Sequence, residues 1–198
     1  GPRDSFTDSS AVFSNGNLKI VCNGSGDDIG GTIVVNSGKW YYEVKLIESQ
    51  NHGAGWTRVV DFTSTEFTAS NSGIVNTSCH IGSKGSNQIA NNGTVTTASN
   101  NWDDNDIVGF AFDIDSGELK IYHNGSLDTT ITSIASDSNG YIPILGDSSS
   151  NDASFEVNFG QQGFTYTPPA GYKALSTKNL PPNVSSIIRP QKHFDTLL

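Results

Sequence analysis

The 198-residue sequence contains no methionine, only two cysteines and only 11 lysine and arginine residues. Aspartate and glutamate number 20, so the formal net charge is -9 at pH 7. Binding to nucleic acid needs basic groups that displace counterions from phosphates, and this balance argues against it. It argues equally against an anionic membrane surface. No apolar run approaches the roughly 20 residues of a membrane span, and we recognise no signal peptide. We therefore expect neither a nucleic-acid partner nor membrane insertion.

The two cysteines point to no cofactor. Cys22 and Cys79 could pair, but both lie in strand-like stretches, where a buried free thiol is at least as common. Neither belongs to a Cys-x-x-Cys pair, so a zinc site is not expected. The sequence predicts no metal and no cofactor.

Ser, Thr, Asn and Gly make up about two-fifths of the chain, a composition that favours turns and strands over helices. No stretch shows a sustained helical period. The strand-like runs lie between turn clusters, at Leu18–Cys22, Gly31–Val35, Trp40–Ile47, Thr57–Phe62, Ile107–Ile114, Glu118–His123, Tyr141–Leu145 and Ala153–Phe159. The segment from Asp113 to Glu118 has the Asp, Ser and Gly residues of a hairpin turn.

Two kinds of strand pattern indicate two packed sheets. Residues 107–112 are apolar on both faces, as in a central strand buried between layers. Residues 39–46 alternate instead, with Trp40 and Tyr42 on one face and Tyr41, Glu43 and Lys45 on the other. We predict an all-β, two-layer antiparallel sandwich. The polar stretch 64–106 is expected to form long surface loops and short edge strands.

Both ends of the chain are expected to lie outside the sandwich. Gly1-Pro2 is typical of a protease-cleavage scar, so residues 1–14 are assigned to this scar and an N-terminal extension. The sandwich is assigned to residues 15–175. Residues 176–198 are expected to be an extended, proline-containing linker toward a further module, because proline removes donors that a sheet needs. The chain would then be an internal fragment of a longer protein.

Four segments in one order resemble the SPRY domain family, with its concanavalin-like jelly-roll sandwich. They are Ser37–Val44, Asn105–Asp113, Gly117–Gly125, and Tyr141–Pro143 followed by Val157–Gly160 and Phe164–Tyr166. Each segment has a packing role: Asn124-Gly125 suits a tight turn, and Gly109 allows close approach of a second layer. The core volume is expected from Phe110, Phe112, Ile121, Phe159 and Phe164. The resemblance implies a non-catalytic recognition scaffold that binds through loops at one end.

A second resemblance concerns the end of the chain. The tract Pro169–Pro181, followed by Lys192–Asp195, resembles the junction after SPRY-like modules in structural proteins of bacteriophages and environmental viruses. It implies that the parent is a virion protein, such as a tail or fibre component, assembled in the host cytoplasm. The expected partners are then a host-surface polysaccharide or protein and other modules of the same virion protein.

Four residues are candidates for ligand contacts: Trp56, Arg58, His80 and Trp102. Each tryptophan lies among small polar residues near a strand end, where an exposed indole could stack on a sugar ring. Burial of these indoles in the core is the alternative, because large aromatic side chains are normally mostly buried.

No catalytic residue is expected. The four histidines lie far apart in sequence, and no Gly-x-Ser-x-Gly elbow is present. The acidic stretches Asp103–Asp106 and Asp147–Asp152 have the oxygen ligands of a calcium site, but they lack the spacing of an EF-hand loop, so solvated turns are the simpler interpretation. Asp106 lies where the family resemblance expects an acidic residue that closes a turn.

Three functions remain open. The first is a virion adhesion module whose loops bind a host-surface glycan or protein. The second is a structural spacer, decoration or oligomerisation module of a virion. The third is an intracellular SPRY adaptor that recognises a short peptide.

Overall fold

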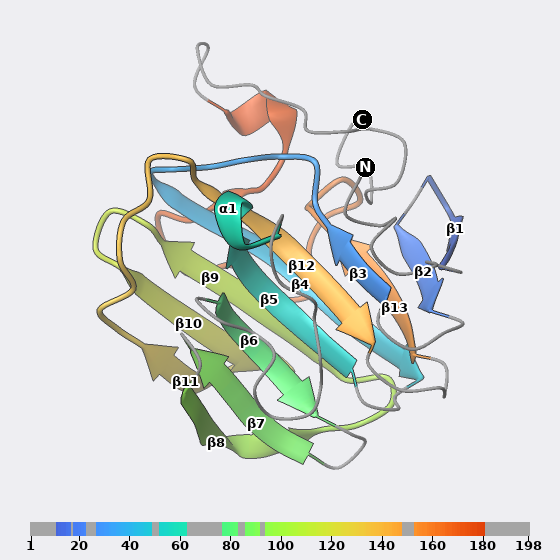
Figure 1. The fold of residues 1–198 in the computed structure, drawn as a ribbon. Helices are drawn as coiled ribbons and strands as arrows, with labels where there is room; N and C mark the ends of the chain where they lie inside the picture. The colour runs from blue at the N-terminus through green and yellow to red at the C-terminus, as the bar shows by residue number, and fades with distance from the viewer. Residues whose placement is uncertain are drawn as a thin grey trace.

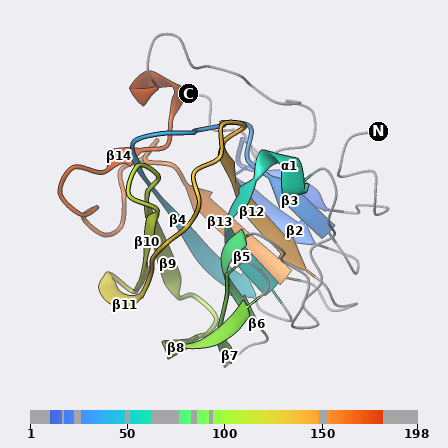
Figure 2. The same ribbon diagram turned by 60° about the vertical axis from the view of Figure 1, so that its left-hand side comes forward.

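The computed structural model describes residues 11–16, 18–22, 27–48, 52–62, 77–82, 86–91, 94–147 and 153–180. Of residues 27–28, 77–82, 86–87 and 147 it describes the backbone alone. Two sheets pack face to face, as Figures 1 and 2 show. The expected all-β antiparallel sandwich is confirmed. No helix in these ranges is long and apolar enough to cross a membrane.

The larger sheet has eight strands. In spatial order they are β1 (Val12–Ser14), β2 (Lys19–Cys22), β13 (Ala153–Asn158), β4 (Lys39–Glu48), β9 (Ile107–Asp113), β10 (Glu118–His123) and β11 (Ser126–Ile131), with β14 (Lys173–Ala174) added beside the start of β4. All pairings are antiparallel except that of β14. Because β1 already pairs with β2, this sheet begins before residue 15.

The smaller sheet has six strands. Their order is β3 (Asp27–Gly30), β12 (Tyr141–Asp147), β5 (His52–Arg58), β6 (Thr77–Gly82), β7 (Ser86–Asn91) and β8 (Thr94–Trp102). At one edge of the sandwich β8 and β11 come together, where the Asn100 amide donates to Asp128. Within the polar middle of the chain, the described residues form β6, β7 and β8, which pair in sequence as antiparallel strands. With nine residues, β8 is longer than the expected short edge strands. Residues 64–76 of the expected surface loops lie outside the described residues.

Two expected strands differ from the structure. The run Gly31–Val35 forms no continuous strand. Gly31 donates to the carbonyl of Pro143, which has no N–H to donate in return, and beyond this point only isolated bridges remain, at Ile33 and between Val35 and Tyr141. The run Thr57–Phe62 ends as a strand at Arg58. Val59–Phe62 instead forms the short helix α1, closed by Arg58 donating to Asp61 at 2.6 and 2.9 Å.

The core lies between the sheets. The even-numbered face of β4 is buried as predicted, and Tyr42 at its centre stacks on Phe110 and Phe159 while its hydroxyl donates to the Gly55 carbonyl of the other sheet. The largest fully buried side chains are Trp56, Trp102, Tyr41, Tyr42, Phe110, Phe112, Phe155, Phe159 and Ile20. Burying each large aromatic or aliphatic side chain stabilises the fold by roughly 2–3 kcal/mol.

The predicted turns have the expected backbone geometry. The β9–β10 hairpin turns through Gly117, whose φ is 66°, and the Ser116 amide donates to Asp113. Asn124 and Gly125, between β10 and β11, have φ values of 47° and 82°, the positive pair that a type I′ turn requires. These two turns connect three neighbouring strands of the larger sheet.

Gly109, on β9, was expected to allow close approach of a second layer, but the group that lies over it is Tyr41 from β4, the neighbouring strand of the same sheet. A Cβ built there would lie 2.4 Å from the Tyr41 hydroxyl oxygen and 3.0 Å from its ring. Tyr41 belongs to the outer, odd-numbered face of β4, yet it is buried. The Tyr41 ring thus lies over the glycine, on the side of the sheet away from the core.

We predict that Gly109→Ala lowers the free energy of unfolding by about 1–3 kcal/mol, because the methyl group displaces the Tyr41 ring. Urea denaturation measures the change, and Thr130→Ala on exposed β11 is the matched control. In a Tyr41→Leu background the same substitution should have a much smaller effect. An equal effect in both backgrounds would contradict this contact.

Candidate binding site

The segment after β13 covers part of the outer face of the larger sheet. Phe164 meets Tyr41 edge-on, with ring centroids 4.8 Å apart at 83°. Tyr166 lies over the turn at Gly125, where an added Cβ would be 2.4 Å from its ring. Phe164 was expected in the core between the sheets, and this prediction is wrong: the chain turns back after Gly160 and places the ring outside. In Figure 2 the segment follows the face of the larger sheet that is turned away from the smaller one.

Glu43 fixes this segment to the sheet. Its side chain points outward from β4, as the alternation predicts, but the residue is only 1% exposed. Its carboxylate accepts the backbone N–H groups of Thr165 and Tyr166, each at 2.9 Å, the Asn158 amide at 3.3 Å and the Tyr41 hydroxyl at 3.2 Å. Burial, with the Glu43 charge beside it, raises the pKa of the Tyr41 phenol, so this hydroxyl remains a donor.

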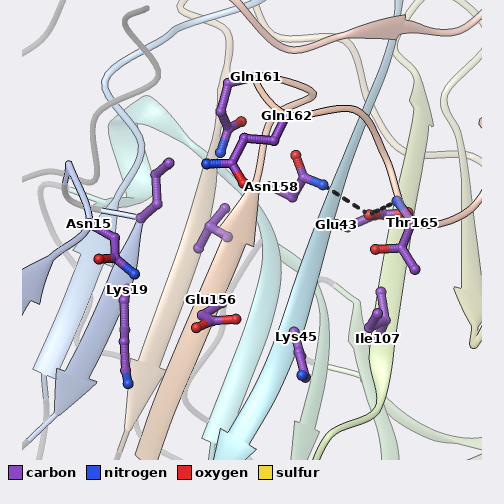
Figure 3. A pocket seen from close by; sticks show the side chains of 12 residues that line it. Asn15, Lys19, Glu43, Lys45, Ile107, Glu156, Asn158, Gln161, Gln162 and Thr165 are labelled. Carbon is purple, nitrogen blue, oxygen red and sulfur yellow. Dashed lines mark hydrogen bonds between the residues drawn. The ribbon is translucent and has the colours of Figure 1, made fainter.

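The uncovered part of the same face forms a hollow of about 550 Å³. Its floor is a row of residues directly opposite one another on four neighbouring strands: Lys19 on β2, Glu156 on β13, Lys45 on β4 and Ile107 on β9. One wall is the covering segment, which contributes Gln161, Gln162 and Thr165, and the opposite side includes Asn15 and Leu18. We call this cavity the outer-face hollow (Figure 3).

The outer-face hollow is polar and carries both signs of charge. Figure 3 shows the Lys19, Glu156 and Lys45 side chains side by side on their strands, with the Glu43 hydrogen bonds closing the end of the hollow. The twelve described residues that line it include no aromatic ring. Glu43 lines the hollow and, through its hydrogen bonds to Thr165 and Tyr166, holds the wall in place.

A second carboxylate, Asp106, organises the corner beside the hollow. It accepts the Asp103 backbone N–H at 2.8 Å and the Asn124 amide at 2.7 Å, and it contacts the His123 ring at 2.8 Å. Burial alone would raise the pKa of Asp106, but the hydrogen bonds from Asn124, Asp103 and His123 outweigh it, and the pKa lies below its usual value. Asp106 therefore closes the turn before β9, as the family resemblance implied.

The four ligand candidates from the sequence do not form one site. Trp56 and Trp102 are 1% and 0% exposed, and their rings pack in the core. This contradicts stacking on a sugar and confirms core packing, because both indoles point between the sheets. Arg58 is engaged by Asp61 and, at 3.6 Å, by Asp137. The His80 side chain lies outside the described residues.

The residues of the outer-face hollow were not predicted as a site. Lys19, Lys45 and Glu156 are ordinary strand residues in the sequence, and only the register between β2, β13 and β4 aligns them. Glu43 could have been identified from its position in residues 37–44, one of the segments that resemble the SPRY family. Residues 164–166, which cover it, belong to another of these segments. Two acidic stretches had the oxygen ligands of a calcium site. Residues 148–152 of the second stretch lie outside the described residues. In the first, Asp106 accepts a backbone hydrogen bond that closes the turn.

We predict that Glu43→Gln lowers the free energy of unfolding by about 2–3 kcal/mol, because the amide presents N–H donors to a site that needs only acceptors. Urea denaturation measures the loss. Glu156→Gln, on the open floor of the hollow, is the control and should change stability by less than about 0.5 kcal/mol. Equal effects of the two substitutions would show that Glu43 is not a buried acceptor.

Asp106→Asn should destabilise the protein in a pH-dependent way. A carboxylate whose pKa is depressed in the folded state adds stability above its unfolded pKa of about 3.9, and this stability is lost as the pH falls through the folded value. Thermal melting between pH 2 and 7 should show the difference from wild type undiminished at pH 5 and above and shrinking below about pH 4. The neighbouring Asp103→Asn is the control. A difference that is constant with pH would contradict the network.

A model of the SPRY domain matches residues 39–162. No curated protein matches the sequence. Among solved structures, the SPRY domain of human HERC1 superposes with a TM-score of 0.62 at 15% sequence identity, over 75% of this chain and 91% of that one. A structure of stonustoxin matches with a TM-score of 0.55 at 18% identity, over 75% of this chain and 25% of the toxin chain.

The two structural matches show the same fold, and the family match covers more than half of the chain, from β4 to the segment that follows β13. Its bounds include Gly109, the β9–β10 and β10–β11 turns, and Glu43. This chain belongs to the SPRY domain family.

Proposed function

We propose that this domain is a non-catalytic recognition module that binds a polypeptide segment of a partner protein in the outer-face hollow. SPRY domains are protein-interaction modules, which supports a protein as the partner. The observation that carries the proposal is the hollow itself, a polar cavity of about 550 Å³ walled by a segment that Glu43 fixes in place. A wall held by the fold provides a preformed site, and binding there needs little reordering.

The lining favours a polypeptide over a glycan. Protein sites for sugars commonly offer an aromatic face, and none of the twelve lining residues that the structure describes is aromatic. They offer instead the side-chain amides of Gln161 and Gln162, which suit a peptide backbone, and charges of both signs on the floor. The floor strands are paired on both sides, so a peptide would be held by side chains and would not add as a strand to a sheet edge.

Adhesion of a virion to a host-surface glycan was predicted from composition and the C-terminal tract. Burial of Trp56 and Trp102 removes the aromatic residues on which glycan binding depended. A peptide-binding hollow agrees with two of the expected roles. One is a virion module that binds a host-surface protein, and the other is an intracellular adaptor. That the parent is a virion protein, located in the virus particle, stays a prediction. If the domain binds neither peptides nor glycans, the role of structural spacer is favoured.

The test is selection of a displayed library of 12-residue peptides on the immobilised domain, followed by titration of the selected peptides. Gln162→Trp should fill the hollow and weaken binding by about tenfold or more, while Thr130→Trp on distant β11 should leave it unchanged. Failure of every peptide to bind, or binding unaffected by Gln162→Trp, would contradict the proposal. Binding on a glycan array that is lost in Gln162→Trp would overturn the choice of a polypeptide.

A further inference from the structure

Two lysines on the floor of the outer-face hollow differ from the other lysines on the same sheet face. Lys39 pairs with Asp113 at 2.9 Å, and Lys120 pairs with Glu118 at 2.8 Å. Within the described part of the chain, no ion pair engages Lys19 or Lys45, although Glu156 lies between them. In a chain of net charge -9, these are two cations in one cavity that make no ion pair with the described residues.

We infer that the outer-face hollow recognises an acidic polypeptide, with two carboxylates three residues apart in a polyproline II segment pairing with Lys19 and Lys45. This inference rests on the proposed function, because it names the class of peptide for that same site. It is carried by the register of the three floor strands, the charge of the two lysines and the walls that confine a bound chain.

The spacing follows from strand geometry. Neighbouring strands lie about 4.8 Å apart, so Lys19 and Lys45, two strands apart and in register, have backbones roughly 10 Å apart. A polyproline II segment rises about 3.1 Å per residue with three residues per turn, so side chains at i and i+3 share a face about 9.3 Å apart. In a β-strand, side chains at i and i+2 are about 6.6 Å apart and those at i and i+4 about 13 Å apart, so neither spacing matches the separation of the two lysines as well.

Glu156 gives the site its selectivity. Its carboxylate lies between the two lysines and faces the ligand residues between the two acids. A third acidic residue there would be repelled, so a continuous acidic run should bind less well than two separated acids. The lysine stems are long and flexible, so the preference for spacing should be graded rather than absolute.

Fluorescence anisotropy with labelled 12-residue peptides tests this inference. The probes are a peptide with Glu-Pro-Pro-Glu at its centre, its Gln-Pro-Pro-Gln analogue, a Glu-Pro-Glu peptide and a peptide with four consecutive glutamates. The Glu-Pro-Pro-Glu peptide should bind about tenfold more tightly than the neutral analogue and about threefold more tightly than the other two. Raising the salt from 50 to 500 mM should remove most of this advantage.

Variants assign the effect to the named residues. Lys19→Gln and Lys45→Gln should each weaken binding of the Glu-Pro-Pro-Glu peptide by about three- to fivefold, while the paired Lys120→Gln should have no effect. Glu156→Gln should improve binding of the four-glutamate peptide and remove its disadvantage. Equal affinity for all four probes, or lysine variants that bind as wild type, would overturn the inference.

The outcomes also separate this inference from the proposed function. If library peptides bind, are blocked by Gln162→Trp and are indifferent to Lys19→Gln and Lys45→Gln, the hollow binds polypeptides but does not select acidic ones. If no peptide of either set binds, the proposed function fails as well.

Discussion

A buried carboxylate with four neutral donors holds the outer layer of this domain in place. Glu43 receives two backbone N–H groups, one side-chain amide and one hydroxyl, and none of these donors is cationic. A charge removed from water in this way is tolerated only when its acceptor sites are filled. The segment and Glu43 therefore stabilise each other. Hydrogen bonds from the segment offset the free energy needed to bury the Glu43 carboxylate, and the carboxylate holds the segment in one conformation.

Several features of the structure depend on that contact. The covering segment closes above Tyr41, which lies over Gly109 and meets Phe164 edge-on. Farther along, β14 pairs with the start of β4, and Leu175 enters the core. The same segment supplies the wall of the outer-face hollow. The larger sheet thus has the main core on its inner face and, on its outer face, the ring contact between Tyr41 and Phe164 under the segment after β13.

The fold was predictable to the level of strands, faces and turns, because these depend on local sequence. The burial of Trp40 and Tyr42 followed from alternation, and the positive φ at Asn124 and Gly125 followed from turn chemistry. The helical turn after Arg58 was missed because Val59 and Val60 have strand propensity, and a tertiary setting outweighed it.

The site was much less predictable than the fold. Alternation placed Glu43 and Tyr41 on the outer face, but nothing local shows that a segment more than 100 residues later in the sequence, at Thr165 and Tyr166, covers them. Lys19, Glu156 and Lys45 come from three distant parts of the chain, and their alignment depends on strand register alone. Trp56 and Trp102 illustrate the opposite error, since polar neighbours in sequence gave no information on where their indoles point.

Native-state hydrogen exchange at the backbone amides of Thr165 and Tyr166 tests the central claim most directly. If Glu43 fixes the covering segment, both amides should exchange as slowly as those of β4 and β9, although they lie in a segment without regular secondary structure. Exchange at the rate of exposed loops would contradict the account, because the wall of the hollow would then not be held by Glu43.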